Sequence, residues 1–144
     1  MKTLVKTFAM TALISLSTWT MAASKPKKEI VNLSSANLAI DHYIDVMTEG
    51  ESKGVEQLFA SDFNLKVQGP KLQNYNREEV LDFLKKQKGK KMNCQTTTTI
   101  MDESAHYMIA RVTMKFEDFT KIDLVMLVNE GGAWKVSSSV NSYQ

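Results

Sequence analysis

The stretch MNCQTTTTIMDESAHYMIARVTMKFEDFTKIDLVMLVNEGGAWKVSSSVNSY, from Met92 to Tyr143, decides the fold of this chain. It is rich in β-branched and aromatic residues, which favour strands, and the run Thr96–Thr99 is the clearest example. Short polar segments interrupt it, and Gly131-Gly132 is typical of a tight hairpin turn. We therefore expect four consecutive antiparallel strands: Met92–Met101, His106–Phe116, Ile122–Val128 and Ala133–Val140.

The third of these strands, Ile122–Val128, is apolar on both faces. Leu124 and Met126 share one face, because successive side chains of a strand point to opposite sides of the sheet. Val125 and Leu127 share the other face, and we expect that face to point outward, away from the helices. An exposed apolar sheet face marks an interaction surface. The pattern therefore predicts a homodimer formed through the outer face of the sheet.

Two amphipathic helices precede these strands. The first covers Ala36–Glu49, with Ser34 or Ser35 as its cap, and its apolar residues recur at the helical period. The second begins after Asn76, which has Glu79 three residues later, as in a capping box. Between the two helices we expect a short helix around Val55–Phe59 and two strands, Asp62–Gln68 and Lys71–Tyr75.

Residues 1–23 have the three parts of a secretory signal peptide, namely a basic head, an apolar run and small residues at the exit. The run is short and rich in Ser and Thr, which disfavours the alternative of a retained membrane anchor. We expect cleavage near Ala23, a polar leader over residues 24–33 and one domain over residues 34–144. A lipid anchor is not expected, because no cysteine lies near the exit. The predicted location is the periplasm or the extracellular medium.

Charge and cysteine content argue against several classes of function. The chain has 18 basic and 16 acidic residues, and removal of Lys2 and Lys6 with the signal peptide leaves sixteen of each. A neutral chain offers no charge-based case for binding nucleic acid, or a membrane after cleavage. Cys94 is the single cysteine, which excludes an intrachain disulfide, and we expect it to be buried. No metal site and no cofactor is predicted.

Six residues are candidate ligand contacts. Tyr43 lies at the centre of the apolar stripe of the first helix, where its ring serves either the core or a pocket. Arg111 and Asp123 lie on neighbouring strands and form either an ion pair on the outer face or, if they point inward, a polar anchor for a ligand. The other candidates are three methionines that line either the core or an adaptable apolar pocket, Met108, Met114 and Met126.

The order of the elements and three local stretches resemble the nuclear transport factor 2-like superfamily. The stretches are Val55–Phe63, the helix entrance Asn76–Val80 and the closing hairpin Gly131–Val136. The resemblance covers nearly all of residues 34–142 and is greatest for secreted bacterial members, SnoaL-like or named "putative lumazine-binding". It implies an α+β, cone-shaped (cystatin-like) fold, in which a curved antiparallel sheet wraps three helices and leaves an open mouth.

The resemblance also allows the chemistry of the superfamily's enzymes to be compared with this chain. Steroid isomerase-like members have a tyrosine on the first helix and an acidic base at the end of the first strand. Tyr43 matches the tyrosine, but Val67 stands where the base would be. Dehydratase-like members need an inward histidine and aspartate, whereas His42 lies on a polar helix face and His106 lies near a strand start, at the rim. No catalytic residue is therefore assigned.

Three functions remain open. The favoured one is a secreted binding or accessory domain, not an enzyme, whose cone takes a small apolar or aromatic molecule. The first alternative is an isomerase- or dehydratase-type enzyme acting on a small apolar substrate. The second alternative is a homodimeric interaction module with a filled cone.

Overall fold

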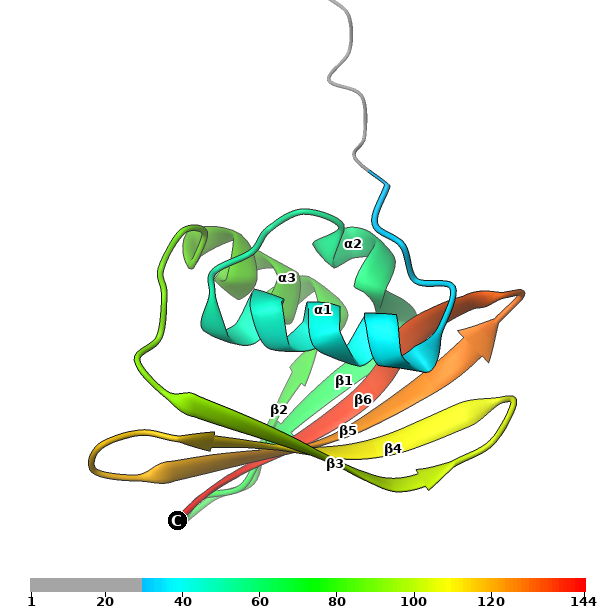
Figure 1. The fold of residues 1–144 in the computed structure, drawn as a ribbon. Helices are drawn as coiled ribbons and strands as arrows, with labels where there is room; N and C mark the ends of the chain where they lie inside the picture. The colour runs from blue at the N-terminus through cyan, green and yellow to red at the C-terminus, as the bar shows by residue number, and fades with distance from the viewer. Residues whose placement is uncertain (1–29) are drawn as a thin grey trace, which may run out of the picture.

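The computed structural model describes residues 30–144. The expected signal peptide and most of the expected leader lie outside the described residues. The elements follow the order expected from the sequence, with two helices, two strands, a third helix and four further strands (Figure 1). They are α1 (Ala36–Thr48), α2 (Val55–Leu58), β1 (Phe59–Val67), β2 (Gln73–Asn76), α3 (Arg77–Lys86), β3 (Gln95–Glu103), β4 (Tyr107–Lys115), β5 (Thr120–Glu130) and β6 (Ala133–Tyr143).

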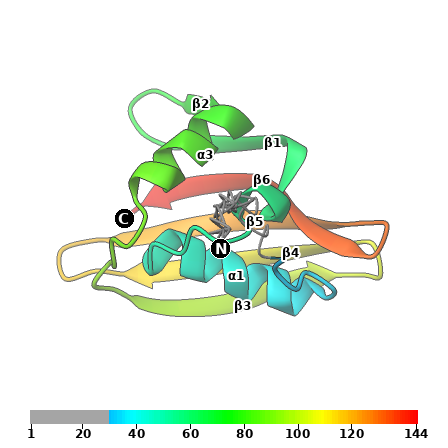
Figure 2. The same cartoon turned by 90° about the horizontal axis from the view of Figure 1, so that it is seen from above.

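The six strands form one curved sheet in the order β2-β1-β6-β5-β4-β3. After β2 the chain passes through α3 to the opposite edge of the sheet, and the meander then returns so that β6 lies beside β1. The β1–β6 pair is parallel, and the other neighbouring pairs are antiparallel. All three helices lie on one face of the sheet, with α1 across β4 to β6 and α3 over β1 and β2 (Figures 1 and 2).

The helix starts predicted from the sequence are confirmed. Ser35 caps α1, since its Oγ accepts a hydrogen bond from the backbone N–H of Leu38 at 3.2 Å. Asn76 and Glu79 form a complete capping box at α3, in which each side chain accepts from the other residue's backbone N–H. No helix within residues 30–144 is long and apolar enough to cross a membrane.

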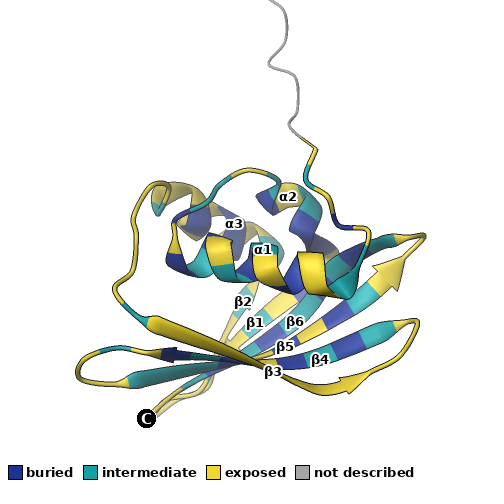
Figure 3. Ribbon diagram, in the orientation of Figure 1, coloured by how far each residue is buried: buried dark blue, intermediate teal, exposed yellow. Residues whose placement is uncertain are grey.

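The prediction of the outward face of β5 is wrong. Buried residues alternate with more exposed ones along β4 and β5 (Figure 3), and Val125 and Leu127 are completely buried under the helices. Leu124 and Met126 lie on the outer face, where they are 41% and 39% exposed. Both faces of this strand are apolar, so hydrophobicity alone could not decide between them.

A β-bulge in β6 changes which residues of that strand point inward. Val136 pairs with Leu127, but the next inward pair joins Ser139 and Val125, so one extra residue is accommodated in β6. Asn141 follows as the next buried residue, opposite Asp123. Regular strand alternation would place Val140 on the same face as Val136, and the bulge moves it to the outer face. The bulge therefore brings two polar side chains into the interior.

Candidate functional site

A pocket of about 680 Å³ lies between the helices and one end of the sheet. Residues from the end of α1, β1, β2, α3, the β4–β5 turn and the end of β6 line it. Its walls are largely apolar, and Leu65, Val67, Val80, Leu84 and Phe116 contribute to them. A cavity of roughly 300–1,000 Å³ with apolar walls is typical of a small-molecule site.

Exposed aromatic rings surround the entrance of this pocket. Phe119 stacks on Phe116 with ring centroids 4.5 Å apart, and Tyr143 lies 6.1 Å from Phe119. Phe83 of α3, also a lining residue, is 54% exposed. Large apolar side chains left in solvent around a cavity lose that exposure when a ligand is bound, which favours binding. The entrance is therefore suited to a flat apolar or aromatic body.

A chain of hydrogen bonds lies in the interior beside this pocket. The Tyr43 hydroxyl donates to Asp123 Oδ2 at 2.9 Å and lies 3.1 Å from Ser139 Oγ. Ser139 in turn donates to Asn141 Oδ1 at 2.9 Å. All four side chains are buried, and the first three are completely so. The chain connects α1 with β5 and β6 and fixes the side-chain orientation of Asn141 at the pocket wall.

Lys121 connects the interior hydrogen bonds to the pocket. Its Nζ donates to Asp123 Oδ2 at 3.1 Å, and its side chain is 14% exposed. Lys121 and Asn141 both line the pocket, whereas Asp123 does not. Strand alternation explains this placement, because Lys121 and Asp123 are two residues apart and share the inner face of β5. The pocket therefore has one ammonium group at its inner wall, with a carboxylate held behind it.

The surroundings of Asp123 and Tyr43 change their acidity. Burial raises the pKa of the Asp123 carboxyl above its ordinary value, and the nearby Lys121 ammonium and Tyr43 hydroxyl oppose part of that rise. Burial, and then the negative charge of Asp123, hold the pKa of the Tyr43 hydroxyl well above its ordinary value. Asp123 Oδ1 is buried with no hydrogen-bond partner among the described residues. A buried carboxylate with one unpaired oxygen is costly, so its two donors are important.

Of the six candidate residues, the structure brings only Tyr43 and Asp123 together, and none of the six lines the pocket. Met108 and Met114 are buried in the core, and Met126 lies on the outer face. Both predictions that place Arg111 beside Asp123, an ion pair on the outer face or an inward polar anchor for a ligand, are wrong. The β4–β5 register places Leu124 opposite Arg111 on the exposed outer face, whereas Asp123 points inward from the opposite side.

Sequence reasoning missed Lys121, Ser139 and Asn141. A signal for Lys121 was available, because it lies two residues from Asp123 and therefore shares its face of the strand. Ser139 and Asn141 carried no such signal, since the bulge in β6 determines the face on which they lie.

Cys94 precedes β3 and is only partly buried, contrary to expectation, and that partial burial raises the pKa of its thiol.

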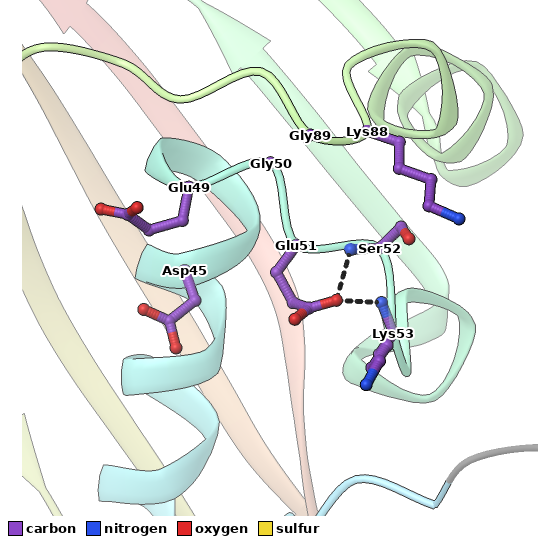
Figure 4. A pocket seen from close by; sticks show the side chains of 8 residues that line it. All are labelled: Asp45, Glu49, Gly50, Glu51, Ser52, Lys53, Lys88 and Gly89. Carbon is purple, nitrogen blue, oxygen red and sulfur yellow. Dashed lines mark hydrogen bonds between the residues drawn. The ribbon is translucent and has the colours of Figure 1, made fainter.

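A second hollow, of about 470 Å³, lies where the loop after α1 approaches the end of α3 (Figure 4). Its acidic residues include Glu51, whose Oε1 accepts from the backbone N–H groups of Ser52 and Lys53 at 2.8 and 2.7 Å. The backbone donors, chiefly that of Lys53, lower the pKa of Glu51. Glu51 therefore stabilises its own loop. No group of three His, Cys, Asp or Glu side chains within residues 30–144 is placed to hold a metal ion.

Comparisons with known proteins agree on the fold. The profile of a family described as "Putative lumazine-binding" matches residues 32–142. No curated protein gives a significant match. Solved structures that resemble the chain include a nuclear transport factor 2-like protein of unknown function from Silicibacter pomeroyi, with 13% identity, 75% of this chain and 92% of that chain covered, and a TM-score of 0.63.

Two further solved structures extend this comparison. A nuclear transport factor 2-like protein of unknown function from Methylobacillus flagellatus has 21% identity, with 75% of this chain and 88% of that chain covered, and a TM-score of 0.62. A ketosteroid isomerase-like protein from Erwinia carotovora atroseptica has 14% identity, with 77% and 95% covered, and a TM-score of 0.57. At these identities the likeness concerns the fold alone.

Proposed function

This chain belongs to the family described as "Putative lumazine-binding", and we propose that it is a binding domain whose pocket takes a small molecule with an apolar or aromatic body. The observation that carries the proposal is the pocket of about 680 Å³, which has apolar walls and exposed aromatic rings at its entrance. Pockets of this size enclose most of the surface of a small organic molecule.

Binding is supported over catalysis by the positions of the acidic and basic groups among the described residues. Val67 lies at the end of β1 and lines the pocket, where an isomerase-type reaction would need a base. The acidic lining residue Glu79 is occupied in the capping box of α3. His42 Nε2 lies 2.7 Å from the Lys53 carbonyl oxygen, outside the pocket, and His106 is exposed.

Substitution of Val67 by tryptophan tests whether this pocket is the binding site. We expect the neutral fluorescent probe N-phenyl-1-naphthylamine to bind the wild-type protein, and Val67→Trp to weaken binding roughly tenfold or more by filling the cavity. Lys66→Trp is the matched control, because Lys66 is exposed on the other face of the same strand. On that face it pairs with Val140 of β6. Fluorescence titration measures both affinities. Equal affinity in Val67→Trp and Lys66→Trp would exclude this pocket as the site.

We also propose that two copies of the chain associate through the outer face of the sheet. None of the described helices covers this face (Figure 1), and Leu124 and Met126 are exposed on it beside the half-buried Ile109, Ile122 and Val140. An apolar centre of this kind is typical of the core of a homodimer interface. The chain's formal net charge is only +2, so two copies repel each other weakly.

Leu124→Glu is expected to convert the dimer to a monomer, because it places a charge in the centre of the apolar face. The matched control is Leu72→Glu, since Leu72 is 51% exposed in the β1–β2 turn, outside the strands whose residues form this face. Both exposed substitutions should leave the free energy of unfolding of the monomer nearly unchanged. Light scattering at micromolar concentration gives the mass of each protein. A monomeric wild type, or a dimeric Leu124→Glu, would contradict the proposed interface.

A further inference from the structure

We infer that the ligand of this pocket is an organic monoanion, an apolar or aromatic body carrying one carboxylate whose oxygens accept hydrogen bonds from Lys121 and Asn141. The inference rests on the proposed function, since it names the chemical class of the molecule that the pocket takes. It concerns the inner wall of the pocket, where these two polar side chains interrupt the apolar surface.

The first argument is the number of hydrogen-bond donors that the protein leaves free at this wall. An ammonium group has three N–H donors, and Lys121 uses one of them on Asp123 Oδ2. The Asn141 amide has its oxygen occupied by Ser139, and its NH₂ group has no hydrogen bond to any described residue. The NH₂ group is not completely buried, and Asn141 lines the pocket. Both residues therefore offer donors, and a ligand oxygen matches them.

The second argument is the balance of charge on the lining. Lys90 and Lys121 contribute two ammonium groups, against one acidic lining residue, Glu79. Glu79 Oε2 already accepts from the backbone N–H of Asn76 at 2.8 Å. Asp123 offsets part of the Lys121 charge, but it is completely buried and does not line the pocket. A ligand at this wall therefore meets the ammonium and not the carboxylate, which favours an anionic group over a cationic one.

The third argument is the rigidity of the two donors. Lys121 is held by Asp123, and Asp123 is held by the Tyr43 hydroxyl from α1. Asn141 is held by Ser139, which lies 3.1 Å from the same hydroxyl. One chain of hydrogen bonds therefore positions both groups before a ligand arrives. Polar groups that are fixed in advance bind with a smaller entropic cost than free side chains.

A matched set of three naphthalene compounds tests the inference. 1-Naphthoate, 1-naphthamide and 1-naphthylmethylammonium share the ring and differ in the charge of the substituent. We expect 1-naphthoate to compete with bound N-phenyl-1-naphthylamine at neutral pH with an affinity about tenfold higher than that of 1-naphthamide. The ammonium compound should be the weakest of the three. Competition titrations followed by fluorescence give the three affinities.

Two variants connect this preference to Lys121. Lys121→Met combined with Asp123→Asn removes the ion pair as a whole, so that no buried charge is left unpaired. We expect this double variant to bind 1-naphthoate and 1-naphthamide equally. Lys88→Met is the control, because Lys88 lines the second hollow and not this pocket. It should keep the full preference for the carboxylate.

The outcomes separate the inference from the proposed function. If the probe binds but the three compounds have equal affinities, or if the double variant keeps the preference, the inference is overturned while the proposed function stands. If 1-naphthoate fails to displace a bound probe, the inference is also overturned. A protein that binds neither the probe nor any of the three compounds would instead refute the proposed function.

Discussion

Gly50→Ala is expected to lower the free energy of unfolding by about 3 kcal/mol. Gly50 has a φ of +68°, a left-handed conformation that costs an alanine about 1–2 kcal/mol. A Cβ at this position would also lie 2.6 Å from the Lys90 nitrogen, 2.8 Å from the Gly89 nitrogen and 2.9 Å from the Gln87 oxygen. All three atoms belong to the backbone, so they cannot move aside as a flexible side chain could.

The crowding around Gly50 follows from the way in which the ends of α1 and α3 meet. The Gly89 N–H donates to the Gly50 oxygen at 2.9 Å, and the Met92 N–H donates to the Thr48 oxygen at 2.7 Å. These bonds bring two backbone segments into contact beside the pocket, which Gly50 and Lys90 both line. We therefore expect Gly50→Ala to weaken probe binding as well as folding.

Gly89→Ala is the matched control for this substitution. Gly89 also has a left-handed conformation, with a φ of +75°, but a Cβ built on it meets nothing within 4 Å. Gly89→Ala should therefore lower the free energy of unfolding only by the cost of the left-handed conformation, about 1 kcal/mol. Urea denaturation of the two variants and the wild type measures the difference. Equal losses in Gly50→Ala and Gly89→Ala would show that the backbone contacts around Gly50 are not the cause.

The local features of the fold could be predicted from the sequence because short-range chemistry determines them. The caps at Ser35 and Asn76 depend on residues three positions away, and the turn at Gly131-Gly132 depends on the glycines themselves. The direction of side chains in β5 depends instead on the rest of the sheet. Each face of that strand is apolar, so only the packing of the helices decides that Val125 points inward.

The candidate site was predicted only in part, for a related reason. Tyr43 was identified from its place in the apolar stripe of the first helix, and Asp123 as a neighbour of Arg111. The structure joins these two residues to each other instead, although 80 positions separate them. Their other neighbours depend on strand register and on the bulge that turns Ser139 inward. Arg111 was paired with Asp123 because the two strands are neighbours, but residues on opposite faces of a sheet cannot form that pair.

Lys121→Met is expected to cost about 3–5 kcal/mol of the free energy of unfolding at neutral pH. Lys121 provides one of the two hydrogen bonds to Asp123 Oδ2, and Asp123 Oδ1 has no partner among the described residues. The substitution therefore leaves a completely buried carboxylate with a single neutral donor, the Tyr43 hydroxyl. The cost arises from the unpaired charge, and protonation of Asp123 removes it.

The cost of Lys121→Met should therefore depend on pH, and the sign follows from the raised pKa of Asp123. Burial makes this pKa higher in the folded protein than in the unfolded chain, so the folded protein binds more protons. The contribution of Asp123 to the free energy of unfolding is complete below its pKa in the unfolded chain, about 4, and is lost as the pH rises through its pKa in the folded protein. Lys121 lowers the pKa of Asp123 in the folded protein. Without Lys121, the loss therefore continues to higher pH.

The deficit of Lys121→Met relative to the wild type should be small near pH 4 and should grow towards pH 8. Denaturation by urea at several pH values measures it. In the double variant with Asp123→Asn there is no carboxyl to protonate, so the pH-dependent part of the deficit should disappear. A deficit of the same size at every pH would contradict this account, because it would show that the lysine stabilises the fold by packing its methylene chain and not by pairing with Asp123.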